Sequence, residues 1–273
     1  MRHEQDAETG VVGAGWGGRE VPAPPRKSAS GRRRFLSVAA TVLVGTAFPL
    51  VGGPARAAKV AVQIPAPAVN LADPSARMGG DPQKVVIAGG CFWGTQLVYQ
   101  HTRGVIQALS GYTGGTAETA NYEDSSLGTT GHAQVVEVTF DPAVITYGQL
   151  LHIFFSVAHD PTQLDRQGHD VGTQYRSALF LSEPGQKKFA EQYITQLDAA
   201  GVHEGRIVTR LEPLQAFYPA EDYHQDYATR HPDSAYVINV DLPMLANLKT
   251  FFPQYHRPEP ILVNVTERVA SKR

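Results

Sequence analysis

Residues 85 to 102 read VVIAGGCFWGTQLVYQHT, and this stretch decides the fold. The β-branched run 85–88 is typical of a short buried strand, and Gly89-Gly90 ends it. From 92 to about 102, apolar residues recur at helical spacing, which predicts a helix. The protein's one cysteine, Cys91, therefore lies where a strand gives way to a helix.

A lone cysteine beside aromatic residues is most often a small buried hydrophobe. The position of Cys91 favours a second interpretation, because unpaired backbone N–H groups at the start of a helix stabilise a thiolate and lower its pKa. The two glycines let another molecule approach the backbone, and Phe92 and Trp93 can form an apolar wall beside the sulfur. We therefore expect Cys91 to be a nucleophile for a substrate with a small apolar end.

The rest of the folded part interleaves strands and helices. Strand patterns cover 105–115, 132–142, 174–182 and 206–213. Helical patterns cover 145–159 and 184–201, with a shorter helix inside 217–232. Within 132–142, Gln134, Val136, Val138 and Phe140 fall on one face. This order predicts an α+β protein with a two-layer α/β sandwich.

Composition and charge exclude several classes of protein. The chain has 273 residues and a formal net charge of −2. Lys and Arg outnumber Asp and Glu in the first 57 residues, so the remainder is mildly acidic, which argues against a nucleic-acid partner. One cysteine and scattered histidines give no zinc-binding spacing, so no metal is expected.

The N-terminus resembles a twin-arginine export signal over residues 1–57. Arg32-Arg33-Arg34 precedes an apolar run, 38–51, and Ala55-Arg56-Ala57 follows as a cleavage region. The alternative is a membrane anchor, but the apolar run is shorter than the ~20 residues that span a bilayer. We expect a cleaved signal, no stable anchor, and a periplasmic or otherwise exported protein.

Three further segments follow the predicted signal. Residues 58–83 are rich in Ala, Pro and Gly and predict a flexible linker. Residues 84–241 form the predicted folded domain. The tail from Val237 onward carries mixed signals, and 242–273 is treated as a C-terminal extension.

Eight motifs, in order and with matching spacing, resemble the A-type peptide methionine sulfoxide reductases. They run from about Val85 to Tyr227: GGCFWG (89–94), GYTGG (111–115), NY (121–122), TGHAQ (130–134), FDP (140–142), HDPTQ (159–163), RQGHDVGTQYRSA (166–178) and AEDYHQDY (220–227).

The resemblance implies a ferredoxin-like sandwich that reduces methionine S-sulfoxide, free or in proteins, and so repairs oxidised proteins. It implies no cofactor. Matched by motif, the resemblance implies that Cys91 is the nucleophile and becomes a sulfenic acid. It implies that Phe92 and Trp93 form the pocket for the methyl group, that the hydroxyls of Tyr122 and Tyr175 bind the oxygen, and that the carboxylate of Asp170 orients them.

This chain departs from the family pattern in two ways. The recycling cysteines that many members carry are missing, so an external thiol, such as a thioredoxin-like protein, must restore Cys91. Gln134 stands where the family usually has Glu. An amide cannot act as a general acid, so we expect a slower reductase that relies on its tyrosine pair. We also expect the protein to be a monomer.

Two alternatives remain at this point. Gln134 is also compatible with a catalytically weak domain that binds oxidised-methionine segments. A cysteine–histidine peptidase would need one of four histidines as a base, and the sequence favours hydrogen-bonded structural roles for all of them: His132, His159, His169 and His224.

Overall fold

The computed structural model describes residues 61–68, 72–77 and 80–263. The predicted signal, 1–57, lies outside these described residues. Within the described ranges, no helix has both the length and the apolar character needed to cross a membrane.

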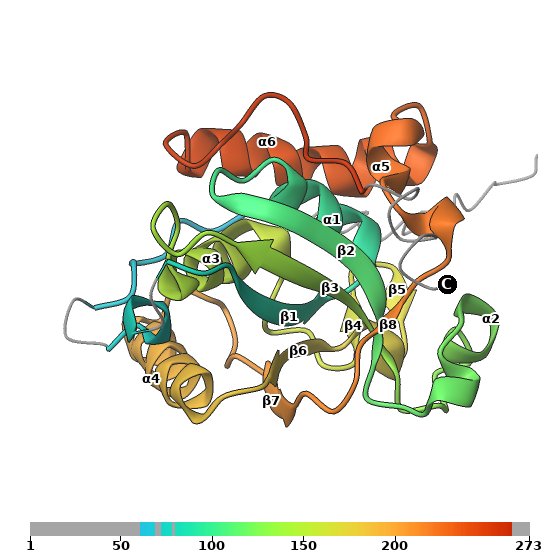
Figure 1. The fold of residues 1–273 in the computed structure, drawn as a ribbon, viewed down its shortest axis with the longest axis horizontal. Helices are drawn as coiled ribbons and strands as arrows, with labels where there is room; N and C mark the ends of the chain where they lie inside the picture. The colour runs from blue at the N-terminus through green and yellow to red at the C-terminus, as the bar shows by residue number, and fades with distance from the viewer. Residues whose placement is uncertain (1–60, 69–71, 78–79, 264–273) are drawn as a thin grey trace, which may run out of the picture. The chain divides into compact units, whose positions relative to one another are not determined.

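A six-stranded sheet forms the centre of the fold (Figure 1). Its spatial order is β7-β6-β1-β3-β2-β8. Only β6 and β7 pair in parallel, and every other neighbouring pair is antiparallel. The strands are β1 (Gln83–Gly89), β2 (Val105–Thr113), β3 (Ala133–Phe140), β6 (Ser177–Leu181), β7 (Arg210–Pro213) and β8 (Tyr218–Pro219).

The four central strands appear in space as fourth, first, third and second along the chain, because β4 and β5 stand apart from this sheet. With α1 after β1 and α3 after β3, this is the β-α-β-β-α-β arrangement of ferredoxin-like folds. The predicted α+β sandwich is confirmed. The helices are α1 (Phe92–Gln100), α2 (Tyr122–Ser125), α3 (Tyr147–Ile153), α4 (Pro184–Ala200), α5 (Tyr227–Arg230) and α6 (Leu242–Phe251).

Irregular elements fill the connections. A second, two-stranded sheet pairs β4 (Arg166–Gln167) with β5 (Asp170–Val171). Two π-helical turns precede or follow α-helices, η3 (Phe154–Ala158) and η6 (Val237–Asp241). The 3-10 turns are η1 (Pro74–Arg77), η2 (Ala117–Thr119), η4 (Thr173–Tyr175) and η5 (Asp222–His224).

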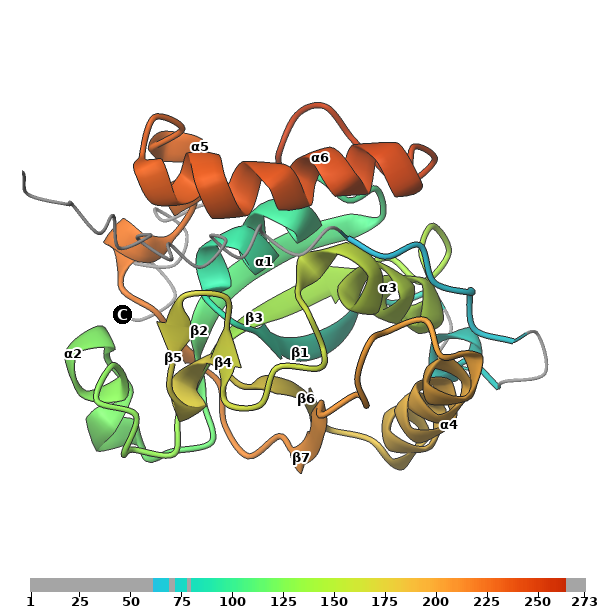
Figure 2. The ribbon, with the colours of Figure 1, turned by 180° about the vertical axis from the view of Figure 1, so that it is seen from behind.

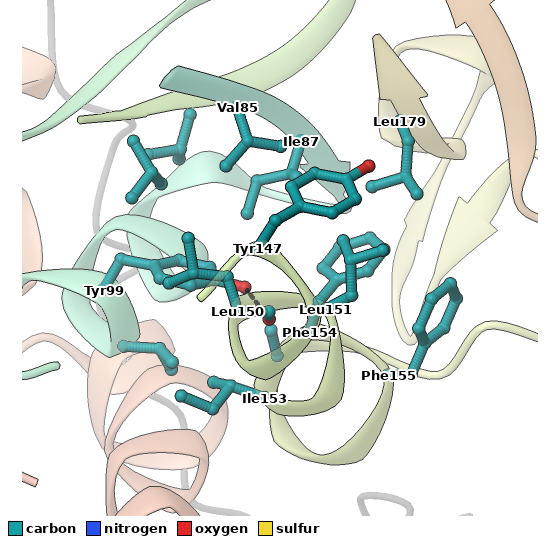
Figure 3. Packing of buried hydrophobic residues seen from close by; sticks show 14 of the residues in the cluster. Val85, Ile87, Tyr99, Tyr147, Leu150, Leu151, Ile153, Phe154, Phe155 and Leu179 are labelled. Carbon is teal, nitrogen blue, oxygen red and sulfur yellow. Dashed lines mark hydrogen bonds between the residues drawn. The ribbon is translucent and has the colours of Figure 1, made fainter. Parts of the chain in front are cut away.

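The main core lies between the sheet and the helices α1, α3 and α4. Figure 3 shows Val85 and Ile87 of β1 and Leu179 of β6 facing Leu150, Leu151 and Phe154. The Tyr99 hydroxyl of α1 donates to the Leu150 carbonyl at 2.9 Å, so the two helices are joined by a buried polar contact as well as by packing.

The opposite sheet face carries a smaller apolar cluster that includes Ala133 and Val135 of β3. Leu214 and Phe217, from the connection between β7 and β8, pack against it. Val136, Val138 and Phe140 enter the main core, so the predicted alternation along β3 is confirmed.

The C-terminal helix α6 covers α1 on its side away from the sheet, as Figures 1 and 2 both show. Leu248 and Phe252 are buried in the main core. The backbone N–H of Val263 donates to the Asp226 carboxylate at 3.0 Å. The described part of 242–273 is therefore packed on the domain, which differs from a separate extension beginning at residue 242.

The described parts of 58–83 are also packed. Ile64 is 4% exposed, and its carbonyl oxygen lies 2.9 Å from Nε2 of His152 in α3. The Tyr193 hydroxyl of α4 donates to the Pro65 carbonyl at 2.8 Å. The Gly148 backbone N–H in the first turn of α3 donates to the Asp73 carboxylate at 2.8 Å. The described residues of this segment therefore differ from the predicted flexible linker. The prediction rested on an Ala/Pro/Gly-rich composition, which carries no sign of hydrogen-bond partners far away in the chain.

Candidate active site

Cys91 occupies the predicted junction between strand and helix. It is the N-cap residue of α1, and its side chain makes no capping hydrogen bond. Gly90 turns the chain with φ of 93°, a left-handed conformation that favours glycine. A Cβ built on Gly90 would lie 2.6 Å from Cβ of Gln167, so the close approach permitted here is made by this chain's own strand β4. We expected another molecule in that place.

The pKa of the Cys91 thiol is raised, which contradicts the expected lowering by the helix start. Cys91 is only partly exposed, and the burial of its thiol is the main cause. The charges of Asp241 and Asp170 act in the same direction. The Trp93 backbone N–H and the nearby Tyr236 hydroxyl oppose this effect without cancelling it. The resting thiol is therefore protonated at neutral pH, and attack requires a group that takes its proton.

Gln134 holds the first turn of α1. Its side chain is 2% exposed, and Oε1 accepts a hydrogen bond from the Phe92 backbone N–H at 3.2 Å. The amide thus satisfies one of the unpaired N–H groups at the helix start. Gln134 therefore lies beside the residue that follows Cys91, with its side-chain oxygen bound to the helix start.

The two aromatic residues after Cys91 have different surroundings. The Phe92 side chain is 1% exposed in the main core, and its ring centroid lies 5.0 Å from that of His224. The partly exposed Trp93 stacks on Tyr227 at 3.7 Å and donates from Nε1 to Nδ1 of His224 at 3.2 Å. This bond makes Nδ1 of His224 an acceptor, so the proton of the neutral ring is on Nε2.

His224 connects α1 to the start of α2, where Tyr122 lies. The ring centroids of His224 and Tyr122 lie 4.6 Å apart. Glu221 fixes the same helix start, since its carboxylate accepts from the Tyr122 backbone N–H at 2.8 Å and from the Tyr112 hydroxyl at 2.9 Å. The motif AEDYHQDY contained both residues, but neither was predicted as a site residue.

Tyr175 and Asp170 come from the β4–β5 segment and the turn after it. The pKa of Tyr175 is raised, first by burial and then by Asp170, Cys91 and Tyr122, so the four groups lie close enough to interact electrostatically. Burial raises the pKa of Asp170 as well. The structure therefore brings together the thiol, the carboxyl and both hydroxyls named from the sequence.

Two further residues, both beyond the last matching motif, reach this site. The Tyr236 hydroxyl donates to Oδ2 of Asp170 at 2.5 Å, and its ring lies edge-on to Trp93 with centroids 5.6 Å apart. Asp241 is 1% exposed and interacts electrostatically with Cys91 and Asp170. Asp241 was missed because the residues after 237 show no regular pattern, and Tyr236 was missed because it lies beyond the last matching motif.

Three of the four histidines that could serve as the base of a cysteine peptidase have other partners. His159 approaches the Phe154 carbonyl at 3.1 Å and the Ser177 hydroxyl at 2.7 Å. A ring nitrogen of His132 lies 2.9 Å from the Thr116 carbonyl, and His224 accepts from Trp93. Across the described ranges, no group of three or more His, Cys, Asp or Glu side chains is arranged to hold a metal ion.

Known proteins carry the same sequence pattern and fold. A sequence model of the family described as "Peptide methionine sulfoxide reductase" matches residues 83–254. The chain is 52% identical over 181 residues to "Peptide methionine sulfoxide reductase MsrA 2" of Mesorhizobium japonicum, covering 66% of this chain and 93% of the relative. It is 48% identical over 192 residues to the protein of the same name from Synechocystis, covering 70% and 88%.

A solved structure agrees. Mxr1 from Saccharomyces cerevisiae in its reduced form superposes with a TM-score of 0.52 at 34% identity, covering 56% of this chain and 87% of that protein. Most of each relative is therefore covered by its match to this chain, and the range that the family model matches, 83–254, contains Cys91, Gln134 and Asp170. The chain belongs to the peptide methionine sulfoxide reductase family, and it is an MsrA-type oxidoreductase that reduces methionine sulfoxide.

Proposed function

We propose that the protein reduces methionine S-sulfoxide, free and in proteins, by attack of the Cys91 sulfur on the sulfoxide sulfur. The observation that carries this proposal is the placement of the chain's single thiol at the start of α1, within electrostatic reach of Tyr175 and Asp170. The sulfoxide oxygen passes to Cys91, which becomes a sulfenic acid, and methionine leaves.

The surrounding residues divide the work of binding. Tyr122 and Tyr175 hold the sulfoxide oxygen through their hydroxyls, and Asp170 orients them. Phe92 and Trp93 enclose the methyl group. Because Gln134 accepts from the Phe92 backbone, it keeps the first turn of α1, and with it the sulfur, in position.

Recycling depends on a second molecule. Because the sequence contains one cysteine, the sulfenic acid has no thiol in its own chain with which to form a disulfide. A small thiol or a thioredoxin-like protein attacks it, releases water and leaves a mixed disulfide, which a further thiol resolves. We propose that the protein needs no bound cofactor and acts as a monomer.

A single-turnover assay tests the function. The reduced protein is mixed with each epimer of methionine sulfoxide without reductant, and methionine and protein mass are measured. We expect about one methionine per chain from the S epimer and a gain of one oxygen on Cys91. Cys91→Ser should release none, and methionine release by that variant would refute the assignment.

A weak binder of oxidised-methionine segments is the second candidate. Gln134 and the raised thiol pKa favour it, because both make the first chemical step slower. The same assay, repeated with excess dithiothreitol, separates the two, since a binder retains the sulfoxide and releases no methionine under either condition.

We also propose that the protein is exported, on the basis of Arg32-Arg33-Arg34 and the apolar run after it. Replacing Arg32 and Arg33 with Lys should retain the protein inside the cell with its leader attached. Normal export of that variant, or a mature protein that keeps its first 57 residues, would contradict this proposal.

A further inference from the structure

Asp241 is a buried carboxyl group with no evident structural purpose. It lies at the junction of η6 and α6, with backbone angles of the right-handed helix and no capping hydrogen bond. Neither of its carboxylate oxygens has a hydrogen-bond partner among the described residues. A buried carboxyl group without a partner destabilises the fold, so its presence calls for a role other than stability.

The carboxyl lies against the first turn of the helix that carries the nucleophile. A Cβ built on Gly94 would be 2.6 Å from Oδ1 of Asp241 and 2.7 Å from Sδ of Met244. Gly94 is three residues after Cys91, and residues three apart share a helix face. The glycine therefore leaves space for a carboxyl group beside the thiol.

The titratable groups that face Asp241 belong to the same site. They are Cys91 at the start of α1, Asp170 of β5 and Tyr236, which precedes η6. Asp170 already accepts the Tyr236 hydroxyl. Burial, and then the charge of Asp170, raise the pKa of Asp241 to about 7, so both of its protonation states are populated at neutral pH.

We propose that Asp241 is the proton carrier of the reduction step, a role that rests on the function proposed above. Its carboxylate takes the proton of the Cys91 thiol as the sulfur attacks. Gln134 cannot take this role, because an amide does not ionise and its oxygen already accepts from Phe92. Asp170 would have to give up its hydrogen bond with the Tyr236 hydroxyl to take the proton, whereas Asp241 has no hydrogen bond to give up.

The step balances without another reactant. The Cys91 S–H bond breaks and its proton moves to Asp241. The Cys91 sulfur forms a bond to the sulfoxide sulfur. The oxygen then moves to the Cys91 sulfur, and the bonds that join the methionine sulfur to the oxygen and to the Cys91 sulfur break, which leaves an electron pair on the methionine sulfur. Asp241 returns the proton to the oxygen, which gives Cys91–S–OH and methionine. Methionine gains two electrons, and Cys91 loses two.

Asp241→Asn tests this role, with Asp233→Asn as the matched control because Asp233 is exposed in the same segment. At pH 7, methionine release in the first turnover should fall about 10²-fold or more in Asp241→Asn and stay unchanged in Asp233→Asn. The midpoint of Cys91 alkylation by iodoacetamide should move to lower pH only in Asp241→Asn, since a negative charge is removed. The shift shows that the Asp241 charge acts on the thiol. The loss of rate identifies the proton carrier, because removing a carboxylate that only raised the thiol pKa would make attack faster.

Other outcomes are decisive as well. If Asp241→Asn releases methionine within about threefold of the unsubstituted protein, or leaves the alkylation midpoint in place, the proposal is overturned while the reductase function stands. If the unsubstituted protein releases no methionine, both proposals fail. Should Asp241→Asn not fold, the pH profile of the unsubstituted protein decides, because first-turnover release should rise with pH through a midpoint near 7 and then level off.

Discussion

Gln134 and Asp241 approach the start of α1 from different parts of the chain. Gln134 lies on β3, and Asp241 lies where η6 meets α6. Gln134 supplies a fixed acceptor for the Phe92 N–H, and Asp241 supplies an ionisable carboxyl near Gly94. Positioning and proton transfer, which a single carboxyl group can combine, are therefore assigned to two residues in this protein.

This division predicts how substitutions at the two positions combine. Gln134→Glu should change first-turnover release little while Asp241 is present, because the proton already has a carrier. In the Asp241→Asn background the same change should recover part of the lost rate, since it returns an acid to the first turn. Rapid-quench measurement of methionine release in all four proteins checks this. Equal effects of Gln134→Glu in both backgrounds would show that the two positions act independently.

The raised pKa of Asp241 also predicts how stability depends on pH. The ordinary value is 3.8 and the folded value is about 7, so between these the folded protein binds more protons than the unfolded chain. Stability therefore falls as pH rises from about 4 to about 7 and then stays level for this group. Asp241→Asn should raise the free energy of unfolding by about 1–3 kcal/mol at pH 8 and by little at pH 4. Urea denaturation at both pH values checks this, and a destabilised variant at pH 8 would contradict it.

At the scale of elements, the turn from β1 to α1 sets the position of the thiol. Gly90→Ala places a methyl group on Gln167 at a left-handed φ, and we expect a loss of about 2–4 kcal/mol together with slower turnover. Gly168→Ala is the matched control, because Gly168 has φ of 57° and no atom within 4 Å of the added carbon. It should cost about 1–2 kcal/mol. Equal losses in the two variants would mean that contact with β4 does not matter.

The sequence was informative where local pattern and tertiary role agree. β1, α1 and β3 were predicted because alternation and helical spacing continue over several residues, and Cys91, Gln134 and Asp170 followed from ordered motifs. Tyr236 and Asp241 could not be predicted in this way. Their roles depend on α6 packing over α1, and the π-helical turn before α6 breaks the regular spacing from which a helix is recognised.

The thiol pKa was predicted wrongly for a related reason. A helix start is visible in the sequence, whereas the burial of Cys91 and the approach of Asp241 arise only when distant segments meet. The prediction included the effect of the local backbone dipoles on the thiol pKa. It did not include the larger contributions to this pKa that come from tertiary packing.

At the scale of the whole molecule, the segment before β1 belongs to the domain. A chain that begins at residue 61 should match the full chain in stability. A chain that begins at residue 80 should lose about 2–4 kcal/mol, because it exposes the site of Ile64 and removes the acceptor of the Tyr193 hydroxyl. Thermal unfolding of both shortened chains checks this. Equal melting temperatures would show that 61–77 adds nothing to stability.

The order in which the ribosome makes the chain gives the packing of α6 a consequence for timing. Cys91 emerges in the first half of synthesis, whereas Tyr236 and Asp241 emerge near its end, and the buried Asp226 joins the Gln100 side chain of α1 to the backbone of Val263. A chain released before residue 241 carries the thiol without the carboxyl group proposed to accept its proton. Incomplete chains should therefore reduce methionine sulfoxide about 10²-fold more slowly, so that nearly all activity comes from molecules in which α6 has been made and packed.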